Sequence, residues 1–430
     1  MENNKNKILV ISHNPFSTYQ SMGKTLKSLF AAFEKNELCQ IYIYPAVPDV
    51  DICQSFYRIT DKDVLKFWYR FRVNGKEVGP DISTHSIYEN IADEKIYNNP
   101  KNKSESRKLI RDMMWKTAPW YNRRLKQWLD REAPTCIFLA PGYAKFIYDI
   151  ALKISKDYSI PIITYVCDDY YFAARPRNWV GDMQHRLLRK KIEEIMNRSC
   201  LIVGISQEII DRYSEYFSVE TALIMTGSNI GVIKKLPKKK IIKNFSYFGN
   251  VGLKRETSLA DIGRALDEIN RERKTEYHLH IYTGTQSEAV ETALRDIKSV
   301  RMCGFLTGEA FVHAFVNADC LVHVESFDVQ MTDLVSGSIS TKIADSLASG
   351  IPMLAYAPAG IASVEHLRRN NCAFIADQCT SLKEIICQML DDGEKCNLIS
   401  QNAVYTADRY HISNKNSAYL KSLIEKITGE

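Results

Sequence analysis

The chain has 430 residues, of which 45% are hydrophobic and 25% charged, and its formal net charge is +6. This composition is typical of a globular protein with two or three domains and excludes an intrinsically disordered chain. No apolar run approaches the length of a membrane span and no signal peptide precedes the first strand, so we expect a cytoplasmic protein.

Eleven cysteines occur without a Cys-x-x-Cys pair, and several lie inside apolar strands. This usage is typical of reduced thiols that pack as small hydrophobic side chains. Cys320, His323 and His313 have no second ligand pair at a suitable spacing, and packed core residues are the favoured interpretation. We therefore predict no structural metal.

The first part of the chain, 1–226, alternates short apolar runs with helical patterns. Strands are expected at 7–12, 40–45, 136–141, 161–167 and 200–206. This alternation predicts a parallel sheet covered by helices on both faces. An aromatic and basic stretch at 59–132 interrupts it and is predicted to be an insertion. Its aromatic residues are expected to form local core, the alternative being contact with an acceptor or a membrane interface.

The strand and helix alternation stops in a segment rich in Gly and Lys at 227–243, which we predict to be an interdomain linker. It restarts at 244–405, where it predicts a second doubly wound α/β domain. The remaining residues, 406–430, are expected to form a helix that packs back on the first domain. The predicted fold class is thus α/β with two Rossmann-like domains.

Residues 22–25, Met-Gly-Lys-Thr, look like the end of a Walker A motif. Thr18 occupies the position of the first glycine, which argues against a P-loop NTPase. The loop that contains Gly23 and Lys24 still follows the first strand, at the edge where open α/β sheets bind ligands. We expect it to contact a ligand.

Three carboxylates follow predicted strands at the same kind of edge. Asp168 and Asp169 end the run at 161–167, and Glu325 ends the run at 320–324. Paired carboxylates repel each other, which raises one pKa and suits acid–base catalysis, although helix capping is the common alternative. We predict these three residues as catalytic candidates.

Two segments of the second domain are candidates for binding phosphate. Gly249 and Asn250 lead to Lys254 and Arg255 at the start of a helix, where cations suit a diphosphate; solvated basic residues are the alternative. The polar run 336–340 leads into a second helix, with Ser340 as the predicted cap, followed by Thr341, Lys342 and Asp345. Its N–H groups favour phosphate, and the alternative is an ordinary capped helix.

The order of these motifs resembles the GT-B glycosyltransferases of the group 1 type, particularly those of bacterial capsule and surface-polysaccharide assembly. The resemblance covers nearly the whole chain and is most specific in VRMCGFLTGEAFVHAFVNADCLVHVES and STKIADSLASGIPML. It implies two Rossmann-like domains that face a central cleft, with the C-terminal helix crossing back. The donor then lies against the second domain and the acceptor against the first, where Gly23 and Lys24 belong to the acceptor-side loop.

The resemblance also implies residue roles. Lys254 and Arg255 stand where the family binds the diphosphate, and Asp345 stands where it has a ribose-binding glutamate. Gly337 replaces a second glutamate of the family, so Glu325 or Asp328 is expected to serve from a longer loop. The expected donor-binding residues are Gly249, Asn250, Lys254, Arg255, Ser340, Thr341, Lys342 and Asp345. The family's first-domain histidine is absent, and Asp168 or Asp169 occupies the matching strand end.

The implied function is transfer of a sugar from a nucleotide-diphosphate sugar to a glycan or lipid-linked acceptor in surface-polysaccharide biosynthesis, with retention and without a metal or cofactor. The alternative is a non-catalytic partner of the same fold, for which Gly337 is the best support. Asp-x-Asp triplets at 49–51 and 61–63 match metal-dependent transferases, but such triplets arise easily by chance.

Basic residues are concentrated at 186–191 and 234–240. Neither run has the interleaved aromatic residues or the module of a nucleic-acid-binding protein, so we predict no nucleic-acid partner. An anionic lipid surface fits such charge better, and peripheral contact with the inner face of the membrane is expected.

Overall fold

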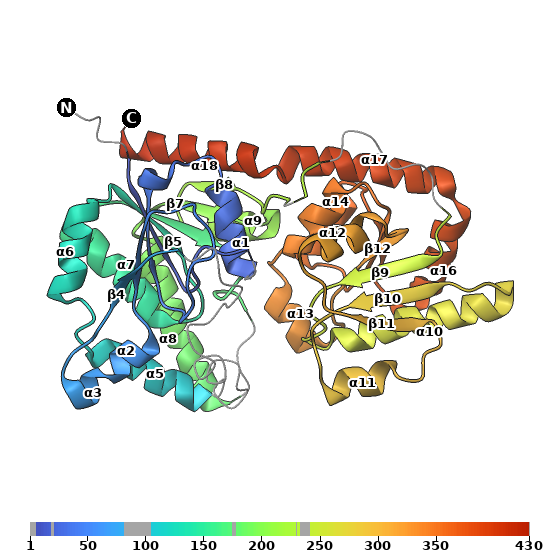
Figure 1. The fold of residues 1–430 in the computed structure, drawn as a ribbon, viewed down its shortest axis with the longest axis horizontal. Coiled ribbons are helices and arrows are strands. Elements are labelled where there is room, and N and C mark those ends of the chain that lie inside the picture. Colours follow the sequence, from blue (N-terminus) through green and yellow to red (C-terminus); the bar gives the residue numbers. More distant parts are fainter. Residues whose placement is uncertain are drawn as a thin grey trace. The chain divides into compact units, whose positions relative to one another are not determined.

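The structure is a computed structural model that describes residues 6–18, 21–80, 105–173, 178–228, 230–232 and 241–429. The chain divides into two compact units, which we call unit 1 (Met1–Met225 with Ser413–Glu430) and unit 2 (Thr226–Ile412). Each unit contains a mainly parallel sheet flanked by helices (Figure 1). The predicted class, two doubly wound α/β domains, is confirmed.

Unit 1 has, among its described residues, an eight-stranded sheet in the order β4-β3-β2-β1-β5-β6-β7-β8, in which only the β3 and β4 pair is antiparallel. The strands are β1 (Ile8–Ser12), β2 (Leu38–Tyr42), β3 (Ser55–Arg58), β4 (Lys76–Val78), β5 (Cys136–Ala140), β6 (Ile162–Val166), β7 (Ser199–Gly204) and β8 (Thr221–Leu223). The strands found from apolar runs are buried on both faces. β3, β4 and β8 were not predicted, because they are short and of mixed polarity.

Helices cover both faces of this sheet (Figure 1). They are α1 (Ser21–Leu29), η1 (Lys35–Glu37), α2 (Asp61–Leu65), α3 (Phe67–Arg70), α5 (Glu105–Thr117), α6 (Arg123–Glu132), α7 (Lys145–Tyr158), α8 (Trp179–Met196), α9 (Gln207–Tyr216) and α18 (Ser413–Thr428). Trp115 of α5 and Trp128 of α6 are fully buried in the same hydrophobic core as β1. Helices α5 and α6 of the segment predicted as an insertion therefore contribute to the core of unit 1, while residues 81–104 lie outside the described residues.

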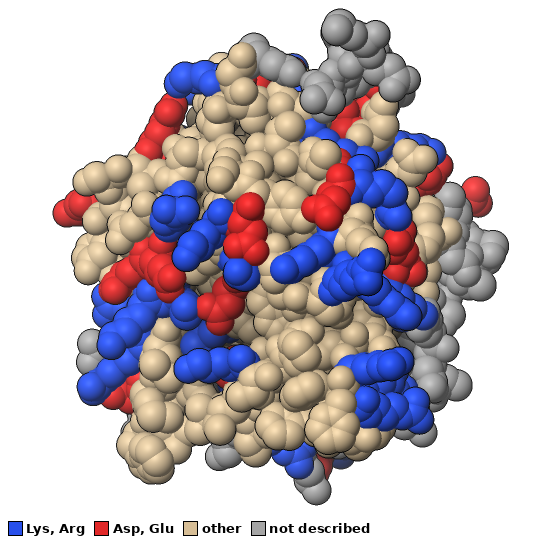
Figure 2. Space-filling model, turned by 90° about the vertical axis from the view of Figure 1, so that its left-hand side faces the viewer, with Lys and Arg blue, Asp and Glu red and all other residues tan. Residues whose placement is uncertain are grey.

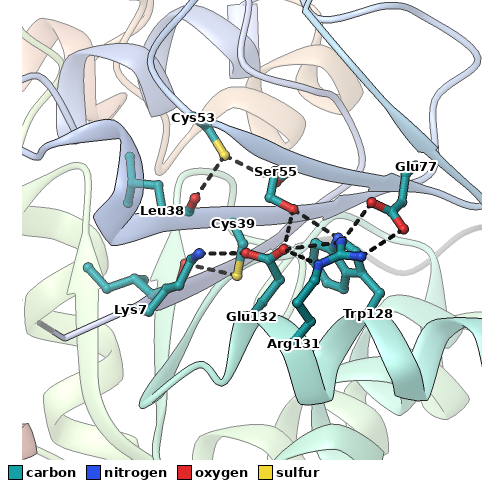
Figure 3. A network of polar contacts seen from close by, with 10 residues as sticks. Lys7, Leu38, Cys39, Cys53, Ser55, Glu77, Trp128, Arg131 and Glu132 are labelled. Carbon is teal, nitrogen blue, oxygen red and sulfur yellow. Dashed lines mark hydrogen bonds and ion pairs between the residues drawn. The ribbon is translucent and has the colours of Figure 1, made fainter. Parts of the chain in front are cut away.

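A buried carboxylate ties together the edge of the sheet at which the parallel strands begin (Figure 3). Glu132, at the end of α6, accepts hydrogen bonds from Ser55 Oγ at 2.7 Å and from Lys7 Nζ, and Trp128 Nε1 donates to the same Ser55 Oγ at 2.9 Å. Burial disfavours the charged form of Glu132, but the hydrogen bonds from Lys7, Ser55 and Arg131 prevail and lower its pKa. This network is structural, and it leaves the opposite edge of the sheet for ligands.

Unit 2 has, in the part of it that is described, a parallel six-stranded sheet in the order β11-β10-β9-β12-β13-β14. Its strands are β9 (Asn244–Phe248), β10 (His278–Tyr282), β11 (Val300–Gly304), β12 (Cys320–Val324), β13 (Met353–Tyr356) and β14 (Phe374–Ala376). Its helices are α10 (Arg255–Arg273), α11 (Glu288–Leu294), α12 (Gly308–Val316), α13 (Val329–Val335), α14 (Thr341–Ala348), α15 (Ala362–Arg369), α16 (Cys379–Asp391) and α17 (Gly393–Tyr410).

The C-terminal segment forms two helices that belong to different units. Helix α17 packs on α14 within unit 2, and α18 packs on α1 within unit 1. Ser417 Oγ accepts a hydrogen bond from the Ala32 N–H at 2.9 Å, and Lys421 forms an ion pair with Glu37 at 2.8 Å. The chain thus returns to unit 1 at Ser413.

The surface in Figure 2 shows Lys and Arg side chains interspersed with Asp and Glu. In the basic run at 186–191, Arg186 pairs with Asp182 and Lys191 pairs with Asp149 at 2.7 Å. The run at 234–240, and with it most of the predicted linker's basic residues, lies outside the described residues. None of the helices in the described ranges is both long and apolar enough to cross a membrane.

Three buried histidines predict that unit 2 loses stability in acid. His366 Nε2 lies 3.1 Å from His411 Nε2, and burial lowers the pKa of His366 to about 3, that of His411 to about 4 and that of His323 to about 3. The unfolded chain binds these protons near pH 6.5, whereas the folded chain does so only at much lower pH. Each histidine therefore removes about 1.4 kcal/mol of unfolding free energy per pH unit as the pH falls below 6.5.

Urea unfolding of the full chain at pH 7, 6 and 5 checks this expectation. His366→Gln should flatten the pH dependence by about one proton. An unfolding free energy of unit 2 that is the same at pH 7 and pH 5 would contradict buried neutral imidazoles.

Candidate functional site

Four of the predicted site residues meet at the carboxyl edge of the sheet in unit 2. Arg255, Glu325, Ser340 and Lys342 line a small cavity of about 40 Å³ at the ends of β9 and β12. This volume is far below the roughly 300 to 1,000 Å³ of small-molecule sites. The cavity is therefore the floor of a candidate site, and a nucleotide would have to lie over it.

Gly249 lets the chain pass directly beneath a cation. A Cβ atom at this position would lie 1.6 Å from Lys342 Nζ, and the φ of Gly249 is +150°, a value that side-chain-bearing residues rarely adopt. Lys342 Nζ also lies 5.5 Å from the centre of the Tyr247 ring. The glycine loop after β9 and the first turn of α14, distant in sequence, thus hold one ammonium group between them.

Arg255 and Glu325 form a two-pronged ion pair at the floor of the site. Arg255 Nε donates to Glu325 Oε2 at 2.9 Å and Nη2 donates to Oε1 at 3.0 Å. Burial raises the pKa of Glu325 above its ordinary value, and Arg255 opposes that rise. The pair fixes the guanidinium in one orientation at the start of α10, because a bidentate contact constrains both side chains.

Lys254 stands beside this pair in an unusual backbone conformation. Leu253 and Lys254 both have positive φ, +62° and +59°, which is costly for residues with side chains. Lys254 Nζ forms an ion pair with Asp328, and Asp328 also caps α13, a helix within the predicted long loop that the sequence did not reveal. Both cations predicted to bind a diphosphate therefore contact carboxylates in this structure.

At the start of α14 the backbone agrees with the prediction, but the cap does not. Ser340 occupies the N-cap position without a capping hydrogen bond from its side chain, and Thr341 is the first helical residue. The predicted serine cap is therefore wrong, because the hydroxyl does not accept from the first turn. Asp345, one turn later, accepts a hydrogen bond from Ser228 Oγ at 2.9 Å.

Asn250 orders the glycine loop from within. Its side-chain oxygen accepts hydrogen bonds from the Gly252 N–H at 2.5 Å and from Thr285 Oγ at 3.2 Å. The side chain is therefore engaged by the protein, and its contribution to the site in this structure is the shape of the loop.

In unit 1 the two adjacent aspartates have different surroundings. Asp169 is buried and accepts from Arg212 Nη1 at 3.0 Å, from Tyr213 Oη at 3.2 Å and from the Phe172 N–H at 3.1 Å. These contacts connect the segment after β6 to helix α9, so the role of Asp169 in this structure is to fix that segment. Asp168 is less buried and accepts from Tyr170 Oη at 3.2 Å.

The loop after β1 is held by packing and by one carboxylate. A Cβ atom on Gly23 would lie 2.7 Å from the Pro15 carbonyl oxygen, so this glycine allows α1 to pack against the loop, and Lys24 is half-buried in the same helix. Asp49 accepts from the Thr18 N–H at 3.0 Å. Across the described residues no group of three His, Cys, Asp or Glu side chains has an arrangement that could hold a metal ion.

Unit 1 also contains a large cavity that the sequence did not reveal. It has a volume of about 1210 Å³ and is lined by His13, which follows β1, and by Arg58, the last residue of β3. Burial, followed by the charge of Arg111, lowers the pKa of His13 to about 4. The one sequence feature that could have indicated this cavity is the run KFWYRFRV, in which basic residues stand among aromatic ones.

No protein family model matches the chain, and no curated protein matches its sequence. Solved structures do resemble it. They include sucrose-phosphate synthase from Thermosynechococcus elongatus, with a TM-score of 0.63, 11% identity and coverage of 99% of both chains. HepE from Anabaena in complex with UDP has a TM-score of 0.62 and 12% identity, covering 98% of this chain and 100% of that one.

A third similar structure is the trehalose-phosphate synthase of Burkholderia xenovorans in complex with glucose-6-phosphate. Its TM-score is 0.60 at 9% identity, and the match covers 98% of this chain and 100% of that chain. At such low identity the likeness concerns the fold. The chain has the two-unit GT-B fold of these glycosyltransferases.

Proposed function

We propose that the chain is a glycosyltransferase that moves a sugar from a nucleotide-diphosphate sugar to a glycan or lipid-linked acceptor in surface-polysaccharide biosynthesis. The observation that carries the proposal is the close approach of Lys342 to Gly249, next to the bidentate pair of Arg255 and Glu325. Two cations are thereby held at the carboxyl edge of one sheet, where α/β folds bind nucleotides. The fold, shared with glycosyltransferases including one solved with UDP, supports the same reaction class.

The chemistry of such a transfer requires stabilisation of the leaving diphosphate. Lys342 and Arg255 would offset its charge, and the N–H groups of Ser340 and Thr341 at the start of α14 would orient it. Glu325 acts through Arg255 in this scheme, as a positioning residue. Because these cations would take the place of a metal ion at the diphosphate, we propose a metal-independent reaction. We propose that the transfer proceeds with retention.

On the acceptor side, Asp168 is the better placed of the two aspartates. Both carboxylates accept hydrogen bonds within unit 1, but Asp169 is buried whereas Asp168 is half-buried and more accessible. We assign to Asp168 the orientation of the acceptor hydroxyl and to Asp169 the support of its loop.

A nucleotide-sugar assay tests the proposed function. The full chain is incubated with UDP-, GDP-, ADP- and dTDP-sugars, and release of the nucleoside diphosphate is measured with and without a polyprenyl-diphosphate sugar. Release from one donor is expected. Binding of a donor without any release would favour the non-catalytic partner, and absence of both binding and release would overturn the proposal.

Asp345→Ala is expected to weaken binding of the nucleoside diphosphate found in that assay at least about tenfold. The variant lacks the carboxylate that we propose to accept charge-assisted hydrogen bonds from the ribose hydroxyls. Each such bond contributes about 1.5 to 3 kcal/mol to binding. The 2′,3′-dideoxy form of the same nucleotide should bind the variant and the wild type nearly equally. Isothermal titration calorimetry of both nucleotides with both proteins completes the cycle.

Ser228→Ala is the matched control, because it removes the hydroxyl that donates to Asp345 and keeps the carboxylate. It is expected to change affinity much less than Asp345→Ala. If ribo and dideoxy nucleotides lose affinity equally in Asp345→Ala, this residue does not bind the ribose.

A further inference from the structure

The large cavity of unit 1 carries more positive charge than the whole protein. Nine Lys and Arg residues line it against two Asp residues, an excess of seven, whereas the formal net charge of the complete chain is +6. The lining cations are Arg58, Lys62, Lys66, Arg70, Arg72, Lys76, Arg107, Arg111 and Arg124. A cavity of about 1210 Å³ with this lining concentrates anions, because fields of one sign are focused in concave surfaces.

Both aspartates that line the cavity form hydrogen bonds with residues of the segments that build its wall. Asp61 accepts from Arg111 Nε at 2.9 Å and from Trp115 Nε1 at 2.7 Å, and Asp63 forms the capping box of α2 with Thr60. The guanidinium of Arg111 also lies 4.9 Å from the centre of the Phe146 ring. The acidic groups therefore orient cations and the segments that carry them.

The most buried of the lining cations is Arg58. It is only 4% exposed, and its Nη1 donates to the Ala46 carbonyl oxygen at 3.2 Å. His13 lies in the same wall and, with its lowered pKa, is neutral at pH 7. The cavity thus combines a buried guanidinium, a neutral imidazole and several exposed basic side chains at the carboxyl edge of the sheet.

We propose that this cavity binds the phosphate or diphosphate group of the acceptor. Six of its nine cations are arginines, whose planar forks match phosphoryl oxygens, and a diphosphate brings several negative charges into a small volume, unlike a single carboxylate. The inference rests on the proposed function in calling this ligand the acceptor. The acceptor class is a phosphorylated sugar, either a free sugar phosphate or a sugar on a lipid diphosphate.

Exposed aromatic residues beside the cavity favour the lipid source. Trp68, Tyr69 and Phe71 are 58%, 64% and 81% exposed, and they alternate in sequence with the lining residues Arg70 and Arg72. Aromatic side chains next to cations are typical of surfaces that meet lipid headgroups. A lipid diphosphate would place its charged group in the cavity and its chain toward these residues.

Calorimetry of the full chain tests the proposal with three probes: inorganic pyrophosphate, glucose 6-phosphate and farnesyl diphosphate. UDP, GDP, ADP or dTDP, whichever the donor assay identifies, is present at saturation so that the probes cannot bind at the candidate donor site. Arg70→Gln with Arg72→Gln is expected to weaken binding of the preferred probe at least tenfold. The matched control, Arg123→Gln with Lys190→Gln, removes the same charge at exposed positions of unit 1 that do not line the cavity, and it should change affinity less than twofold.

The outcomes separate the sources and the two proposals. Tighter binding of farnesyl diphosphate than of pyrophosphate, lost in Trp68→Ala, assigns the lipid source, and preference for glucose 6-phosphate assigns the free sugar phosphate. No binding of any probe, or equal weakening in the control pair, overturns the cavity proposal. Binding of the nucleoside diphosphate that the donor assay identifies should be unchanged in Arg70→Gln with Arg72→Gln. Failure of UDP, GDP, ADP and dTDP alike to bind the wild type would count against the donor site alone.

Discussion

Arg255→Met is expected to lower the unfolding free energy of unit 2 by about 3 to 5 kcal/mol. The substitution leaves the carboxylate of Glu325, which is 5% exposed, without the guanidinium that it contacts through both oxygens. Removing one partner of a buried pair costs this much, because the remaining charge stays desolvated. Urea unfolding of the full chain measures the loss.

The double variant Arg255→Met with Glu325→Leu separates stability from function. It removes both charges and is expected to recover most of the lost stability, since apolar residues can replace a buried ion pair. Nucleotide affinity should remain low, because the cation proposed to contact the diphosphate is still missing. Full recovery of affinity would show that Arg255 serves the fold alone.

Arg273→Met provides the control on the same helix. Its pair with Asp391 is at the surface, where Asp391 is 62% exposed, so the expected cost is below about 1 kcal/mol. A loss in Arg255→Met no larger than that in Arg273→Met would contradict a buried, preorganised pair.

Trp115→Ala should lower the unfolding free energy of unit 1 by about 3 to 5 kcal/mol, the usual cost of truncating a buried aromatic residue. The indole is fully buried, stacks on the Phe146 ring at 4.2 Å and donates to Asp61 at 2.7 Å. The variant therefore also loosens the aspartate that orients Arg111 in the cavity wall.

Trp68→Ala, at a position 58% exposed in the same region of the chain, is the matched control and should change stability by less than about 0.5 kcal/mol. Circular dichroism during thermal and urea unfolding compares the two variants. Equal and small effects would mean that the segment predicted as an insertion is dispensable for unit 1.

The sequence was sufficient for the strands in the middle of each sheet. Runs such as 161–167 and 320–324 are mostly apolar because parallel strands are buried on both faces, and the periodicity of neighbouring segments marks the helices between them. The edge strand β4 and its neighbour β3 lack this signal. Their residues have the composition of a loop, with polar side chains such as Arg58 and Lys76. Only the pairing with neighbouring strands identifies them as strands.

The local part of the candidate site was also predictable. Gly249 and Arg255 stand in a glycine-bearing turn between a strand and a helix, and Lys342 stands in the first turn of another helix. Turn composition and helix boundaries depend on neighbours in the sequence, so residue types at short spacing indicate them. The contact of Lys342 with the position of Gly249 does not depend on short spacing, and only the fold brings them together.

Long-range contacts decided the remaining features. Asp168 and Asp169 are indistinguishable in sequence, and it is Arg212, 43 residues away from Asp169, that makes one of them structural. The basic cavity likewise collects side chains from two strands, a loop and several helices between residues 58 and 124. The sequence alone determined the fold class and the turns that we propose to bind phosphate, because these follow from local pattern. The tertiary structure decided which charges are paired and where they gather, because those depend on contacts between segments far apart in the chain.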